Sequence, residues 1–194
     1  MEQIRSFIAI ELPQQLKLEL SRLQAGLQTD RPRVKWVAAE GIHLTLKFLG
    51  NVPAGKIDAV TQVMTASAAR SSPFQLDVGG LGAFPNLKRV QVVWVGLGGQ
   101  LDRLKSLQQS LESGLEPLGF AAEKRSFSPH LTLARVGNEA TPAERQHLGE
   151  LIAATDFASQ SAIRVNGIVL MRSQLTPRGA IYSRMASTQL GGNS

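Results

Sequence analysis

HLTLKFLG at residues 43–50 and HLTLARVG at residues 130–137 are two copies of one pattern. The second copy begins 87 positions after the first, the copies align without a gap, and each ends in glycine. Alternating leucines and polar residues predict a β-strand for each copy. A proline that favours the start of a helix follows each copy, Pro53 and Pro142. We interpret the repeat as an internal duplication.

The segments around the repeat alternate between predicted strands and predicted helices. Apolar runs predict strands at 7–10, 74–81, 90–97, 163–171 and 180–185. Leucines three or four residues apart predict helices within 16–27 and 101–118. This order favours an α+β fold in which a βαββαβ-type unit is used twice. We therefore expect a bilobal molecule whose two lobes are pseudo-symmetric and whose sheets face each other across a central cleft.

The length of 194 residues suits a single domain, 1–194, made of two halves. The glycine-rich segment GGLGAFPNLKR (79–89) is the natural junction. We expect lobe-forming halves of about 1–84 and 85–194, with strands free to exchange between the lobes. A site built within one chain makes a monomer sufficient.

Composition excludes several classes of protein. Without cysteine the chain has no disulfide, no thiolate metal site and no thiol nucleophile. No apolar window approaches the roughly 18 residues of a membrane span, so we expect a cytoplasmic protein without a membrane partner. The net charge of +6 favours phosphate-bearing partners.

The repeat places a histidine and a threonine on the same face of each strand. Side chains alternate along a strand, so His43 and Thr45 share one face, as do His130 and Thr132. A pseudo-twofold axis between the halves would bring both pairs to one cleft. The third histidine, His147, has no such partner and is expected on a helix surface.

Two imidazoles suit a reaction that needs one general base and one general acid near neutral pH. Cleavage or hydrolysis of a phosphodiester is such a reaction, and threonine hydroxyls can donate to the non-bridging oxygens. The scheme requires no metal and no other cofactor. A two-histidine metal site is a weaker alternative, because neither copy carries a nearby Asp or Glu.

The paired His-x-Thr-x motifs resemble those of the two-histidine phosphoesterase superfamily. Within that superfamily the chain resembles the bacterial RNA 2′,3′-cyclic phosphodiesterases, also called 2′-5′ RNA ligases. RSFIAIELP at 5–13, GLGAFPNLKRVQVVWVG at 80–96 and LMRSQLTPRGAIY at 170–182 extend the resemblance over nearly the whole chain. The resemblance implies antiparallel sheets lining the cleft and metal-independent hydrolysis of an RNA terminal 2′,3′-cyclic phosphate to a 2′-phosphomonoester.

The resemblance also implies roles for individual residues. His43 corresponds to the proton donor that releases the ribose 3′ oxygen, and His130 to the proton acceptor that activates water. Thr45 and Thr132 correspond to substrate-binding threonines that contact the phosphate. Arg135 corresponds to a further substrate-binding position after the second motif.

Strict alternation makes specific predictions for the residues that follow each His–Thr pair. It places Lys47 on the histidine face and Phe48 on the leucine face. It also places Arg135 on the leucine face, so that Arg135 reaches the cleft only if its strand twists or bulges near Ala134. Arg5, Lys35, Lys47 and Arg172 are further candidates for steering an RNA end.

Two alternative functions remain at this level. The same histidines could join a 2′,3′-cyclic phosphate to a 5′-hydroxyl, which makes a 2′-5′ linkage. The chain could instead be an RNA-end binding module without turnover, in which the His–Thr pairs only bind phosphate.

Overall fold

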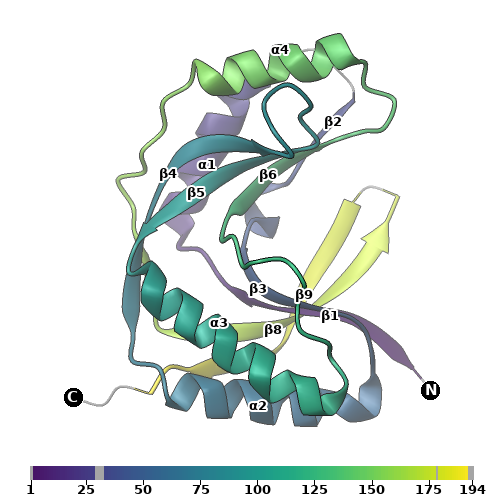
Figure 1. Cartoon of the computed structure of the whole chain (residues 1–194), viewed down its shortest axis with the longest axis vertical. Coiled ribbons are helices and arrows are strands. Elements are labelled where there is room, and N and C mark those ends of the chain that lie inside the picture. Colours follow the sequence, from purple (N-terminus) through teal and green to yellow (C-terminus); the bar gives the residue numbers. More distant parts are fainter. Residues whose placement is uncertain (1, 29–32, 178, 192–194) are drawn as a thin grey trace.

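The two copies of the repeat are neighbouring strands of one sheet in the computed structural model, which describes residues 2–28, 33–177 and 179–191 (Figure 1). The nine-stranded sheet has the order β7-β4-β5-β6-β3-β1-β8-β9, and β2 pairs with β6 off this path. The strands are β1 (Gln3–Ile10), β2 (Val34–Trp36), β3 (Leu44–Pro53), β4 (Phe74–Phe84), β5 (Val92–Gly99), β6 (Leu131–Val136), β7 (Ile163–Val165), β8 (Gly167–Thr176) and β9 (Gly179–Gln189).

In the part of the chain that the structure describes, four α-helices and three short 3₁₀ turns connect these strands. The helices are α1 (Gln14–Leu27), α2 (Ile57–Ala69), α3 (Leu101–Leu115) and α4 (Pro142–Ala153). The turns are η1 (Ala39–Gly41), η2 (Ala54–Lys56) and η3 (Glu116–Leu118). Pro142 occupies the first turn of α4 behind a Thr141–Glu144 capping box, as the sequence predicts for a helix start. No helix within the described ranges is long and apolar enough to cross a membrane.

The α+β fold is confirmed. The two sheets expected from the sequence are joined into one continuous sheet. Every strand pairing is antiparallel, and the two halves of the sheet meet at a single pair, Leu44 of β3 with Leu131 of β6. Outward from this junction the order is β6-β5-β4-β7 on one side and β3-β1-β8-β9 on the other. β4 thus lies beside strands of the second half of the chain, and β8 lies beside β1.

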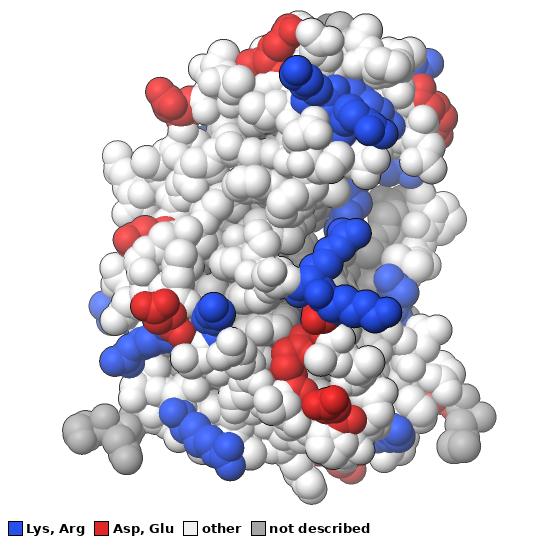
Figure 2. Space-filling model, in the orientation of Figure 1, with Lys and Arg blue, Asp and Glu red and all other residues white. Residues whose placement is uncertain are grey.

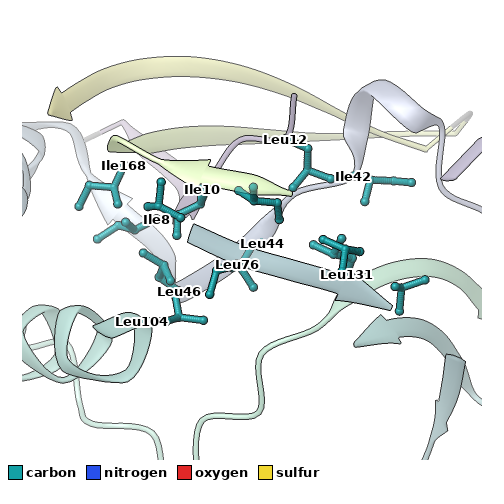
Figure 3. Close-up of a cluster of buried hydrophobic side chains, with 14 of the residues drawn as sticks. Ile8, Ile10, Leu12, Ile42, Leu44, Leu46, Leu76, Leu104, Leu131 and Ile168 are labelled. Carbon is teal, nitrogen blue, oxygen red and sulfur yellow. The ribbon is translucent and has the colours of Figure 1, made fainter. Parts of the chain in front are cut away.

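The helices all pack on one face of the sheet. Leu16 of α1, Met64 of α2, Leu107 of α3 and Ile152 of α4 belong to one cluster of buried hydrophobic residues. Leu44 and Leu131 lie within the same cluster (Figure 3). Among the described residues, the buried hydrophobic cluster on the opposite face is a small one around β1 and β8, made of Phe7, Ala9 and Val169 with Met171 and Tyr182. This second face is therefore left open for a site.

The junction leucines should contribute strongly to stability. Leu44 is fully buried, so Leu44→Ala should lower the free energy of unfolding by about 2–5 kcal/mol, because it removes buried methyl groups and leaves a cavity. Leu175 is 72% exposed, and Leu175→Ala should change stability by less than about 0.5 kcal/mol. Urea unfolding midpoints measure both. Equal decreases in the free energy of unfolding for Leu44→Ala and Leu175→Ala would contradict the burial of Leu44 at the junction.

Candidate active site

The junction between β3 and β6 brings the two His–Thr pairs together. Because antiparallel partners run in opposite directions, the Leu44–Leu131 pair sets His43 opposite Thr132 and Thr45 opposite His130. All four side chains are half-buried and lie on the face opposite the buried leucines. Diagonal neighbours on adjacent strands are about 7–8 Å apart. One phosphate group fits between two imidazoles at this spacing.

Both histidines are held by the same kind of hydrogen bond. Nδ1 of His43 lies 2.7 Å from the carbonyl oxygen of Gly41, and Nδ1 of His130 lies 2.8 Å from that of Ser128. A carbonyl oxygen only accepts, so Nδ1 of each ring donates. Nε2 of each ring is therefore free either to accept a proton or to deliver one. This arrangement orients two equivalent acid–base groups toward the open face.

The surroundings of the two imidazoles differ. His43 stacks on Phe7 with ring centroids 4.5 Å apart and meets Tyr182 edge to face at 5.1 Å. His130 meets Phe84 edge to face at 5.0 Å. Burial lowers the pKa of His43, and the hydrogen bond to the Gly41 carbonyl opposes this in part. The neutral form of His43 is thus favoured in the free protein.

A β-bulge follows the His–Thr pair in each copy. In β3, Thr45 pairs with Ala9 and Lys47 pairs with Ile8, so Leu46 is the extra residue. In β6 the partners of Thr132 and Ala134 are consecutive residues of β5, so Leu133 is the extra residue. The two bulges therefore occupy the same position of the repeat. Each bulge reverses the faces of the residues directly after it, and in β3 a second bulge at Leu49 ends the reversal.

The predictions from strict alternation are therefore wrong beyond the bulge. Lys47 is buried on the leucine face, whereas Phe48 is 57% exposed and its ring centroid lies 5.9 Å from that of Phe7. Arg135 is exposed and follows the buried Ala134, which places Arg135 on the face of Thr132 and not on the leucine face. Phe48 is the residue that alternation missed on this face. The apolar Ala134 directly after Leu133 was an available signal in the second copy, whereas Lys47 and Phe48 continue the alternation of the first copy and gave no such signal.

Lys47 is unavailable to an RNA end. Its Nζ lies 2.7 Å from Glu112 Oε2 on α3 and donates to the carbonyl oxygen of Ala121 at 2.7 Å. The side-chain amide of Gln108 donates to the same carboxylate. This buried network connects β3 to α3 and to the segment that leads to His130. Lys47 is thus a structural residue beneath the site.

The other residues singled out in the sequence lie apart from the histidines or on the surface. Arg172 of β8 lies 3.8 Å from Glu2. Lys35 of β2 is exposed and pairs with Arg135 across the strands. His147 is exposed on α4. Among the described residues, no group of three or more His, Cys, Asp or Glu side chains is arranged to hold a metal ion.

Comparison with known proteins gives one consistent result. A family model described as the 2′-5′ RNA ligase superfamily matches residues 12–176. An RNA 2′,3′-cyclic phosphodiesterase of Methanothermobacter thermautotrophicus is 36% identical over 182 residues, which cover 94% of this chain and 96% of that protein.

Solved structures agree with this match. A protein of Thermus thermophilus superposes with a TM-score of 0.82 at 26% identity, covering 98% of this chain and 100% of that one. Escherichia coli LigT complexed with 3′-AMP has a TM-score of 0.79 at 25% identity, with the same coverage of both chains.

The aromatic surroundings of His43 generate a measurable prediction. The pKa of His43, read from its imidazole proton shifts by NMR, should lie below the usual value of about 6.5, because the ring is buried. Tyr182→Ala should raise this pKa, since it opens one side of the ring to water. Tyr182→Phe keeps the edge-to-face ring and should leave the pKa lowered. If Tyr182→Ala leaves the pKa of His43 unchanged, burial by this ring is not what lowers that pKa.

Proposed function

The chain belongs to the 2′-5′ RNA ligase superfamily, and we propose that it hydrolyses the 2′,3′-cyclic phosphate at an RNA end to a 2′-phosphomonoester, with His43 and His130 as acid and base. The observation that carries the proposal is the junction of β3 and β6. It sets two imidazoles with matched Nδ1 hydrogen bonds diagonally across one pair of strands, with a threonine beside each.

The reaction follows from two proton transfers. Nε2 of His130 accepts a proton from water, and the water oxygen attacks phosphorus. The bond between phosphorus and the ribose 3′ oxygen breaks, and that oxygen takes a proton from Nε2 of His43. The products are a 2′-phosphomonoester and a 3′-hydroxyl, and solvent restores the two protonation states. No cofactor enters these steps.

Thr45 and Thr132 stabilise the charge that builds on the phosphate. Each hydroxyl stands directly across the strands from one histidine, which lets it donate to a non-bridging oxygen held between the imidazoles. Arg135 adds positive charge on the same face, because the bulge at Leu133 rotates it there. The two halves are thus unequal at this position, where the first copy has Phe48.

The acid must be charged when substrate is bound. Burial lowers the pKa of His43 and so opposes the imidazolium form. A cyclic phosphate diester carries one negative charge, and an anion beside an imidazole raises its pKa. The substrate thus helps to protonate the acid that acts on it. His130 faces no such requirement, since a base begins neutral.

The same geometry permits ligation as a side reaction. A 5′-hydroxyl in the place of the attacking water would give a 2′-5′ linkage by the same two proton transfers. Water is in excess at an open site, so hydrolysis dominates unless a second RNA end is held in place.

The chain acts as a cytoplasmic monomer and as one domain in this proposal. Both histidines and both threonines come from one chain, so no second copy is needed to complete the site. The exchange of β4 and β8 between the halves means that neither half completes its own part of the sheet. Light scattering during gel filtration measures the oligomeric state.

The central test uses a short RNA that ends in a 2′,3′-cyclic phosphate, with chelator present. His43→Ala and His130→Ala should each lower kcat by about 10²- to 10⁴-fold, because each removes one proton-transfer group. His147→Ala is the matched control, since His147 lies exposed on α4, and it should retain wild-type activity. Product phosphates are resolved as 2′ or 3′ by chromatography.

Two results would count against the proposal. A 3′-phosphate product would reverse the leaving oxygen assigned to His43. Tight RNA binding by the wild type without any turnover would favour the binding module instead.

A further inference from the structure

We propose that Lys35 and Arg135 form a subsite for a second phosphate, that of the internucleotide linkage next to the terminal cyclic phosphate. The inference rests on the proposed function and deepens it. It assigns this protein a preference for an RNA strand over a single cyclic nucleotide.

The two cations are direct neighbours across a strand pair. β2 pairs antiparallel with β6, with Val34 opposite Val136, Lys35 opposite Arg135 and Trp36 opposite Ala134. Side chains directly opposite each other on such a pair lie on the same face, with Cβ atoms about 4.5–5.5 Å apart. Lys35 and Arg135 can therefore contact a single phosphate together.

This face is the one that carries the histidines. Val34 and Trp36 pack against the hydrophobic core, so Lys35, between them, lies on the opposite face of β2. Ala134 and Val136 also belong to or pack on that core, and Arg135 stands between them. The bulge at Leu133 puts Arg135 on the side of Thr132. The basic pair and the catalytic face are thus continuous.

The pairing of two cations costs stability unless an anion is bound. Like charges directly opposite on a strand pair repel each other. Both side chains are exposed, and neither forms an ion pair with any acidic side chain in the described part of the chain. The nearby Arg33 differs, because Glu144 neutralises it at 2.9 Å. An RNA phosphate would supply the missing negative charge.

The distance to the reacting phosphate suits the next linkage of the chain. Arg135 follows Thr132 by three residues, one of which is absorbed by the bulge. Two strand steps of about 3.3 Å separate the residues along β6, roughly 7 Å in all. That separation matches one nucleotide step along an extended strand. A mononucleotide would leave this subsite empty.

The subsite exists on one side of the pseudo-twofold axis only. The position equivalent to Arg135 in the first copy is Phe48, which is exposed and uncharged. An RNA strand leaving the site is therefore attracted toward β2 and β6 and not toward the end of β3. Figure 2 shows Lys and Arg side chains around the right-hand side of the molecule, between its upper and lower parts. This charge favours the approach of an RNA end.

The test compares two substrates that share the same terminal nucleotide. One is a 2′,3′-cyclic mononucleotide, and the other is a dinucleotide with one internucleotide phosphate and the same cyclic end. Wild-type protein should have the higher kcat/KM for the dinucleotide. Lys35→Gln should lower the ratio of the two kcat/KM values about fivefold, because one charge-assisted contact to the second phosphate is lost. For the dinucleotide, the slope of log kcat/KM against log salt concentration should become shallower by about 0.7.

Two variants separate a phosphate contact from a general effect of charge or folding. Lys105→Gln removes the same charge from an exposed position on α3 and should leave the ratio unchanged. Lys35→Arg keeps the positive charge, so its ratio of kcat/KM for the dinucleotide to kcat/KM for the mononucleotide should stay close to the wild-type ratio. Equal effects of Lys35→Gln and Lys105→Gln, or the absence of a dinucleotide preference in the wild type, would overturn the proposal.

Failure of the proposed function is distinguishable from failure of this inference. If the wild type hydrolyses neither substrate, the proposed hydrolysis is wrong. Calorimetry then measures the Kd of the mononucleotide and of the dinucleotide for wild type and for Lys35→Gln. Tighter binding of the dinucleotide by the wild type, weakened in Lys35→Gln, supports the subsite, and equal Kd ratios in the two proteins overturn it.

Discussion

The site depends on one antiparallel contact, the pair of Leu44 and Leu131 where the two halves of the sheet meet. The leucines fill the core on one face, and their neighbours in each strand are forced onto the other face. A shift of one residue in this register would exchange the faces and bury the histidines. The same pair thus sets both the packing of the core and the positions of the two His–Thr pairs, so a change that disturbs one also disturbs the other.

Two equivalent bulges turn a symmetric framework into an asymmetric site. At Leu46 and at Leu133 one extra residue reverses the alternation, which exposes Phe48 in one copy and Arg135 in the other. The same reversal buries Lys47, whose charge is then satisfied by Glu112 and a backbone carbonyl. The two copies supply two histidines held by the same kind of hydrogen bond, while the residues after each bulge place an arginine on this face in one copy and a phenylalanine in the other.

Strand exchange gives each histidine a neighbour from the other half of the chain. Tyr182, near the C-terminus, reaches His43 because β8 pairs with β1 and carries β9 with it. Phe84, at the end of β4, reaches His130 because β4 pairs with β5. The rings of Phe7 and Tyr182 cover the His43 imidazole, and this burial lowers its pKa. The two histidines thus have different surroundings although their strands are copies.

The amino-acid sequence by itself determined the repeat, the helices that begin near its prolines and the sharing of one face by each histidine and its threonine. These features depend on the periodic spacing of apolar and polar residues, which can be read from residues close together in the sequence. Only the tertiary structure decided that β3 and β6 are neighbours, that Leu46 and Leu133 bulge, and that Lys35 stands across from Arg135. Those features depend on which distant strands pair and in which register. Backbone hydrogen bonds can form between any two strands, so the packing of side chains in the core decides which pairing and which register the chain adopts.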